Sequence, residues 1–307
     1  SLQNLTNCEV VLRNYRKDGG MFWNRLTLSP VLDAQDKVTH FIGILNDVSA
    51  QKMIEAERAF LATHDPLTAL PRFAGSEARI EVLMQQARDH QRRMLLLFVD
   101  LDAFNTINDT MGFAMGDAAL RQVAQRLREV AGPSAQVMRY AGDEFLVAIG
   151  DVDPQADLLQ LATAFCEAIA QPMPISSVVT LYLTASVGAS VFPESGQTVL
   201  ELTRQADIAT NRAKRNGRNG AYVFSNELSE ALGDRLALGS RMRDALTRGE
   251  FLLHYQPQVD AQDGSVAGLE ALVRWDSPEF GLLPPRRFIP VAEDSGMILH
   301  LGAFVLR

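Results

Sequence analysis

Carboxylate side chains stand at two points in this sequence where an apolar run ends. Asp100 follows the apolar residues 94–99, and a run of this length suits a strand buried on both faces. Asp143 and Glu144 lie between two shorter apolar runs, a pattern that predicts a β-hairpin with Ala141-Gly142 at its bend. If the strand end faces the hairpin, these oxygens supply the hard ligands that Mg²⁺ prefers. The structural alternative is a helix cap at Asp100 and a solvated turn at the hairpin.

Three motifs in a fixed order surround these carboxylates. They are residues 100–109 (DLDAFNTIND), Gly116-Asp117 and residues 141–145 (AGDEF). Together they resemble the GGDEF domain of diguanylate cyclases, over a stretch from about Thr63 to Phe224. The resemblance implies a palm-like α/β layer that condenses two GTP molecules into cyclic di-GMP, releases two pyrophosphates and uses Mg²⁺ or Mn²⁺.

The resemblance also implies roles for the acidic residues. Asp100 and Asp143 would bind the metal ions, and the backbone carbonyl of Leu101 would be a further oxygen ligand. Glu144 would be the second carboxylate, either on a metal ion or as the base near the attacking 3′-hydroxyl. In such a site the metal ions neutralise charge while the hydroxyl is held in line with the α-phosphate.

The resemblance further implies that several polar residues bind GTP. Asn108 and Asp117 would recognise guanine, although Asp117 is also expected near a helix start, where an N-cap role explains it nearly as well. Lys214 and Arg218 would contact the phosphates; the alternative is a pair of cations that complement a helix C-terminus. Arg139, just before the hairpin, is expected to be structural.

Three departures from the family pattern bear on activity. Ala141 replaces the first glycine of the motif, and a Cβ there would cost about 1–2 kcal/mol if the φ angle were positive. Asn105 stands where lysine is usual, and Phe113 where histidine is common. The Arg-x-x-Asp motif of product inhibition would fall at residues 132–135, which read Gly-Pro-Ser-Ala, so inhibition through that site is not expected. An alternative function is therefore a domain that binds GTP without turnover and regulates a phosphodiesterase.

Residues 1–49 are dense in strand signals around the turn Asp18-Gly19. They resemble the C-terminal half of a PAS sensor domain and are nearest to its flavin-binding branch, in which Asn14 and Asn24 would hydrogen-bond the flavin. We favour a PAS sheet without a cofactor, because Leu45 stands where that branch usually has glutamine and the half that would carry the reactive cysteine is absent.

The following residues, 49–63, predict a helix with Ser49 as N-cap and with Met53 and Phe60 at helical spacing. One GGDEF domain holds one GTP, so the implied reaction needs a homodimer. We expect this helix to pair with its copy; the alternative is a spacer packed on its own domain.

The C-terminal residues resemble the first quarter of an EAL domain, a domain that hydrolyses cyclic di-GMP. By this resemblance Glu270 would be a metal ligand, Arg274 a phosphate contact, and Gln256 a residue lining the pocket for cyclic di-GMP. The other metal ligands and the general base of the family would lie beyond Arg307, so hydrolysis by this chain is not expected.

Composition limits the remaining alternatives. The net charge is −8, without a basic stripe, which argues against a nucleic-acid polymer as partner. Two cysteines without metal-ligand spacing, no run of transmembrane length and no signal peptide predict a cytoplasmic location. The expected fold class is α/β (α+β multidomain). The predicted segments are 1–49 (partial PAS antiparallel sheet), 50–63 (linker helix), 64–225 (palm-like GGDEF domain), 226–245 (linker helix) and 246–307 (start of an EAL barrel).

Overall fold

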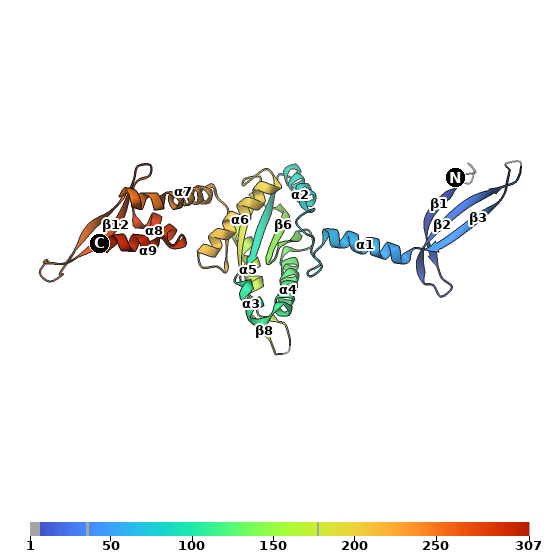
Figure 1. Cartoon of the computed structure of the whole chain (residues 1–307), viewed down its shortest axis with the longest axis horizontal. Coiled ribbons are helices and arrows are strands. Elements are labelled where there is room, and N and C mark those ends of the chain that lie inside the picture. The colour runs from blue at the N-terminus through green and yellow to red at the C-terminus, as the bar shows by residue number, and fades with distance from the viewer. Residues whose placement is uncertain (1–6, 35–36, 177, 307) are drawn as a thin grey trace.

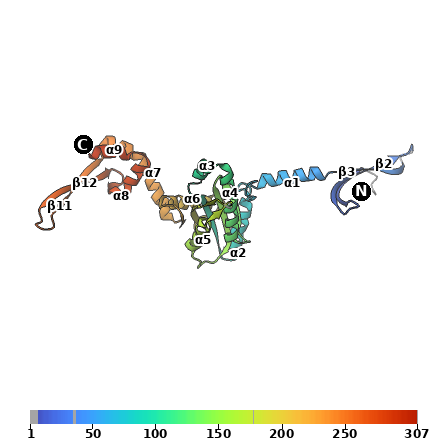
Figure 2. The same cartoon turned by 90° about the horizontal axis from the view of Figure 1, so that it is seen from below.

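The structure, a computed structural model, describes residues 7–34, 37–176 and 178–306. Three bodies lie in a row (Figure 1), and the view turned by 90° in Figure 2 shows the same arrangement. They are a three-stranded sheet, a central α/β domain, and a second three-stranded sheet packed with helices. This confirms the predicted α/β multidomain fold. The helices that join the bodies are α1 (Ser49–Thr63) and α7 (Asn226–Arg248).

The central domain is built on a five-stranded sheet. Its middle strand is antiparallel to both neighbours and is buried along nearly its whole length, as the uninterrupted apolar run predicts. An edge strand is added in parallel. In spatial order the strands are β10 (Gly220–Val223), β9 (Ala185–Phe192), β4 (Arg93–Leu101), β6 (Glu144–Val152) and β5 (Gln136–Ala141).

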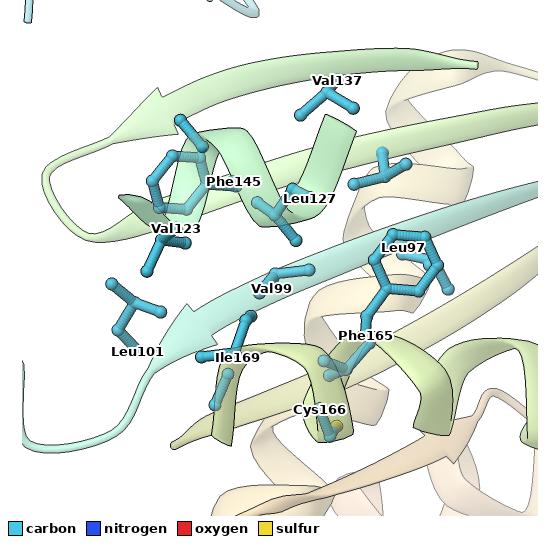
Figure 3. Close-up of a cluster of buried hydrophobic side chains, with 14 of the residues drawn as sticks. Leu97, Val99, Leu101, Val123, Leu127, Val137, Phe145, Phe165, Cys166 and Ile169 are labelled. Atoms are coloured by element: carbon cyan, nitrogen blue, oxygen red, sulfur yellow. The ribbon is translucent and has the colours of Figure 1, made fainter. Parts of the chain in front are cut away.

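Helices cover both faces of this sheet. They are α2 (Glu77–Asp89), α3 (Phe104–Met111), α4 (Phe113–Ala131), α5 (Leu158–Ala170) and α6 (Val199–Arg215). Because successive side chains of a strand point to opposite faces, β4 contributes to two cores. Leu97 and Val99 pack with α4 and α5, as Figure 3 shows, while Leu96 and Phe98 pack on the side of α2 and α6. The end of β4 is therefore fixed from both sides.

A small antiparallel hairpin extends from the same domain after α5. Its strands are β7 (Met173–Pro174) and β8 (Thr180–Leu181).

The N-terminal sheet is antiparallel, with strands β1 (Cys8–Tyr15), β2 (Met21–Leu32) and β3 (Val38–Asp47) in that order. Helix α1 follows it directly, with no buried residue of its own. The prediction of Ser49 as N-cap was wrong, because Val48 occupies that position. The Ser49 hydroxyl instead accepts a hydrogen bond of 2.9 Å from the backbone N–H of Trp23, which ties the helix to β2.

The C-terminal body packs around Trp275, Phe251 and Phe288, whose rings contact one another. The indole N–H of Trp275 donates a hydrogen bond of 2.9 Å to Glu250. No helix in the described parts of the chain has the length and apolarity that a membrane crossing requires. The elements after α7 are β11 (Phe251–Val259), β12 (Val266–Ser277), β13 (Gly281–Leu283), α8 (Pro285–Asp294) and α9 (Ile298–Val305).

Candidate functional site

Strand register brings the two acidic points of the sequence together. Asp100, next to the end of β4, lies directly opposite Glu144, the first residue of β6. The backbone N–H of Leu101 donates to the carbonyl oxygen of Asp143 over 3.4 Å. Asp100 is 8% exposed, and Asp143 and Glu144 are partly buried. Three carboxylates thus share one edge of the sheet, at the tip of the predicted hairpin.

The bend of the hairpin lies one residue later than predicted. Ala141 is the last residue of β5, where it pairs with Glu144 in an extended backbone, and the turn consists of Gly142 and Asp143. Gly142 has a φ of +50°, whereas Ala141 is not among the residues with positive φ. The conformation that disfavours a Cβ therefore falls on the glycine that this chain retains, so Ala141 carries no backbone penalty.

Lys214 neutralises part of this charge. Its Nζ lies 2.5 Å from Oδ2 of Asp100, and the pair is partly buried. One turn earlier on α6, the hydroxyl of Thr210 donates to the backbone carbonyl of Phe98, which fixes the helix against β4. Lys214 is also one of the basic residues in the last turn of α6, as the alternative of a cation that complements the helix C-terminus expects. In this structure the lysine is engaged with a carboxylate of the site.

Lys214 does not fully offset the burial and the mutual repulsion of the carboxylates. Burial raises the pKa of Asp100, Asp143 adds to the effect, and Lys214 opposes it. Burial likewise raises the pKa of Glu144, followed by repulsion from Asp100 and Asp143. Asp207, a partly buried residue of α6 that the sequence did not single out, also repels Glu144, and burial raises its own pKa. A positively charged ligand would relieve this repulsion.

The donor set fits a hard divalent cation that shares its coordination with a substrate. No group of three or more His, Cys, Asp or Glu side chains with metal-holding geometry occurs in the described residues. Asp100 and Glu144 nevertheless offer adjacent carboxylate oxygens. Mg²⁺ characteristically binds one or two carboxylates and takes its other ligands from water and phosphate.

The residues expected to recognise guanine lie on the helix pair α3 and α4. An ideal Cβ built on Gly116 would lie 2.0 Å from Oδ1 of Asn108 and 3.1 Å from the ring of Phe104, so only glycine lets the two helices approach this closely. Asp117 lies beyond the first turn of α4, which begins at Phe113. The N-cap alternative for Asp117 is therefore wrong, because the helix starts earlier than its apolar periodicity suggests.

Arg139 connects the hairpin turn to the start of the domain. Its Nη1 lies 2.6 Å from Oδ1 of Asp65 in a largely buried ion pair, and its Nε and Nη2 donate to the carbonyl of Gly142 over 3.1 and 2.6 Å. Burial alone would raise the pKa of Asp65, but hydrogen bonds from Arg139 and Thr68 lower it. The sequence suggested a structural role for Arg139 without identifying these partners.

Arg218 lies in the exposed loop after α6 with a φ of +62°. In the C-terminal body, Gln256 and Glu270 are direct cross-strand partners on β11 and β12, and both are exposed. Arg274, further along β12, donates to the carbonyl of Val273. The structure thus brings Gln256 and Glu270 together but places Arg274 apart from that pair.

In the N-terminal sheet, Asn24 lies opposite Leu12 and Asn14 opposite Phe22. The two asparagines are therefore diagonal neighbours on one face. Asn24 is 2% exposed, and its Oδ1 has no hydrogen-bond partner among the described residues. This is a polar atom that the described part of the sheet leaves unsatisfied.

Comparison with known proteins agrees with the geometry. Residues 62–220 match the family described as "Diguanylate cyclase, GGDEF domain", residues 240–307 match the EAL domain, and residues 1–50 match a PAS domain. The predicted order of PAS, GGDEF and EAL is confirmed. A solved structure of the GGDEF domain of TpbB (YfiN) from Pseudomonas aeruginosa superposes with a TM-score of 0.53 at 32% identity, covering 55% of this chain and 99% of that one.

Two curated relatives come from the same organism. The bifunctional diguanylate cyclase/cyclic di-GMP phosphodiesterase MucR is 40% identical over 261 residues, which cover 84% of this chain and 38% of MucR. The cyclic di-GMP phosphodiesterase NbdA is 39% identical over 248 residues, 80% of this chain and 31% of NbdA. The chain thus spans about a third of the length of these relatives. Because the GGDEF match alone covers more than half of its 307 residues, the chain belongs to the GGDEF domain family.

Proposed function

We propose that the central domain condenses two molecules of GTP into cyclic di-GMP, with Mg²⁺ or Mn²⁺ held at the edge formed by Asp100 and Glu144. The observation that carries the proposal is that these two residues lie opposite each other in the strand register. Burial raises the pKa of both carboxyl groups, and repulsion from Asp143 raises both further. Such a pair is poorly stabilised by the protein alone. The divalent metal ion that accompanies a nucleoside triphosphate would supply the missing positive charge at these carboxylates.

Each site residue then has a defined task. Asp100, Asp143 and the carbonyl of Leu101 hold the metal ions, which would stabilise charge that develops on the phosphate. Glu144, with its raised pKa, is suited to hold a metal ion or to accept the proton of the attacking 3′-hydroxyl. Lys214, whose Nζ contacts Asp100, would bind phosphate oxygens at the same edge of the site.

The nucleotide itself is positioned by residues further from the carboxylates. Arg218 binds phosphate oxygens as a second cation beside Lys214. Asn108 and Asp117, on adjacent helices, recognise the donor and acceptor edge of guanine. These tasks require only binding and orientation, which in phosphoryl transfer account for much of the rate.

The reaction needs two such domains facing each other, and α1 offers a surface for pairing. It buries no residue in the monomer, and four of its apolar side chains are at least 42% exposed: Met53, Ile54, Phe60 and Leu61. Pairing with the same helix of a second copy would remove this surface from water. We therefore propose a homodimer as the active form.

The flanking bodies are proposed to regulate and extend this activity. The hairpin of Gln256 and Glu270, with Arg274 further along, would form part of a cyclic di-GMP site in a complete EAL domain. The N-terminal sheet would carry the sensory input, and the unsatisfied Oδ1 of Asn24 is the atom through which a ligand would be recognised.

The decisive experiment incubates the purified chain with GTP and Mg²⁺ and separates the nucleotides by chromatography. We expect cyclic di-GMP to appear, and to disappear with Asp143→Ala or with EDTA. The matched control is Glu81→Ala, which removes an exposed carboxylate on α2 and should leave product formation unchanged. GTP that remains intact at millimolar concentration with folded, dimeric protein contradicts the proposal.

A second function is favoured by Asn105, an exposed residue of α3 in place of the usual lysine, and by the similarity of the chain to NbdA, a cyclic di-GMP phosphodiesterase. In this alternative the domain binds GTP without turnover and regulates an EAL domain. Equilibrium binding of a fluorescent GTP analogue, measured in the same samples, distinguishes the two. Binding without any product supports the regulator.

A further inference from the structure

Asp102 is a buried carboxylate next to the site that has no role in the function proposed above. It follows the end of β4 by one residue and is 8% exposed. Its backbone N–H donates to the carbonyl of Thr184 over 2.9 Å. A buried carboxylate is costly unless its oxygens are satisfied, so its partners indicate what it does.

Both oxygens of Asp102 accept hydrogen bonds from neutral donors. Oδ1 accepts from the hydroxyl of Ser186 over 2.7 Å. Oδ2 accepts from the hydroxyl of Thr184 over 2.7 Å and from the backbone N–H of Asn219 over 3.0 Å. Asp102 thereby joins three segments: the end of β4, the start of β9, and the loop between α6 and β10.

That loop has an unfavourable backbone. Gly217, Arg218 and Asn219 are consecutive residues with φ angles of +105°, +62° and +44°. Left-handed conformations of residues other than glycine persist only where neighbouring contacts hold them. The N–H of Arg218 bonds the carbonyl of Ala213 within the helix end, and the N–H of Asn219 bonds Asp102. Asp102 thus holds this loop at Asn219, while the side chain of Asn216 donates to the hydroxyl of Tyr222 on β10.

We propose that Asp102 is a positioning residue that fixes the loop so that Arg218 is presented to the phosphates of GTP. The inference rests on the proposed function, in which Arg218 contacts phosphate. The hydrogen bond from Asn219 is assisted by the charge of the carboxylate, so it is stronger than a neutral bond. Without it, Asn219 loses this bond to Asp102, and the backbone of the adjacent Arg218, from which its guanidinium extends, is held less firmly.

The test is a double-mutant cycle on binding of a fluorescent GTP analogue with Mg²⁺ to the whole chain. We expect Asp102→Ala to weaken binding on the order of tenfold, and to have almost no further effect when combined with Arg218→Ala, because two residues that act through one contact are not additive. Fully additive losses, or unchanged binding by Asp102→Ala, would overturn the proposal.

Two further variants separate positioning from folding. Asp102→Asn is isosteric: its amide oxygen can still accept from Thr184 and Asn219, while its NH₂ group faces Ser186, whose hydroxyl can rotate to accept. We expect it to recover most of the lost affinity. Ser186→Ala removes the partner on Oδ1 and leaves the bond to Asn219, so binding should stay within about twofold of the wild type. If Asp102→Asn binds as poorly as Asp102→Ala, the proposal is wrong.

Hydrogen exchange in the absence of nucleotide tests the attachment of Asn219 to Asp102 without relying on GTP binding. We expect the amide of Asn219 to exchange at least tenfold faster in Asp102→Ala than in the wild type, and unchanged exchange would refute the attachment. A wild type that does not bind the GTP analogue would contradict the proposed function, whereas a wild type that binds it while the two mutations act additively would contradict this inference alone.

Discussion

The central and C-terminal bodies both place acidic residues on paired strands, but only the central body buries the paired side chains. In the central sheet, Asp100 and Glu144 lie on strands packed between two cores, and burial raises the pKa of both. On β11 and β12, Gln256 and Glu270 are equally close in register, yet both are exposed. Strand pairing therefore brings side chains together in both bodies. Only in the central body are both partners carboxylates, and there burial under the covering helices strengthens the interaction of their charges.

The largest effect is expected from substituting one acidic residue in each of these two bodies and comparing cyclic di-GMP formation. Asp100→Asn removes a proposed metal ligand and should lower cyclic di-GMP formation by at least about a hundredfold. Glu270→Gln, the matched change in the C-terminal body, should leave it unchanged. Product formation is measured by chromatography at saturating GTP and Mg²⁺. A strong loss with Glu270→Gln would show that the two regions act as one site, and an active Asp100→Asn would contradict the assignment of the metal ligand.

The next effect concerns the ion pair that holds the hairpin turn. Arg139→Ala leaves Asp65 buried without its cation and the carbonyl of Gly142 without two donors, so we expect it to lower the free energy of unfolding by about 3–5 kcal/mol. The control is Arg16→Ala, whose exposed pair with Asp47 should contribute little. Urea denaturation followed by circular dichroism measures both variants. Equal stability of the two would mean that the Arg139 pair is not a structural contact.

Glu144 and Asp65 are expected to change the stability of the folded chain with pH in opposite directions. Glu144 has a raised pKa in the folded chain, so the folded state binds more protons and stability falls as pH rises from 4.5 through the raised value. Glu144→Gln should therefore melt at a higher temperature than the wild type at pH 7 without metal ions, and the difference should shrink near pH 4. Asp65 has a lowered pKa, so its contribution to stability is present above 3.8 and is lost as pH falls through the lowered value.

Asp65→Asn should accordingly melt below the wild type at pH 7, with a difference that also shrinks in acid. Differential scanning fluorimetry across this pH range, in EDTA, measures both variants. If Glu144→Gln were destabilising at pH 7, the site would not carry the electrostatic repulsion that makes it suited to a cation.

The sequence predicted those parts of the fold that depend on local pattern. The apolar run before Asp100 predicted a buried strand, and the two shorter apolar runs on either side of the bend predicted β5 and β6. The pairing of Asp65 with Arg139 could not be predicted, because 74 residues separate them and neither lies in a pattern that indicates the other. The position of Asp117 near the start of a helix was predicted wrongly. Helix α4 begins at Phe113, an exposed residue outside the apolar periodicity of the helix.

The smallest effect is expected at the tip of the hairpin, where Ala141 replaces the first glycine of the family motif. An ideal Cβ on Gly142 would meet no atom within 4 Å, so Gly142→Ala should lose only the backbone term of about 1–2 kcal/mol. Ala141→Gly restores the usual family motif at a position that is already extended, and product formation should stay within about twofold of the wild type. Chromatography and urea denaturation measure the two variants. A tenfold gain with Ala141→Gly would mean that the methyl group of Ala141, rather than the backbone, obstructs the nucleotide, and would favour GTP binding without efficient turnover in this chain.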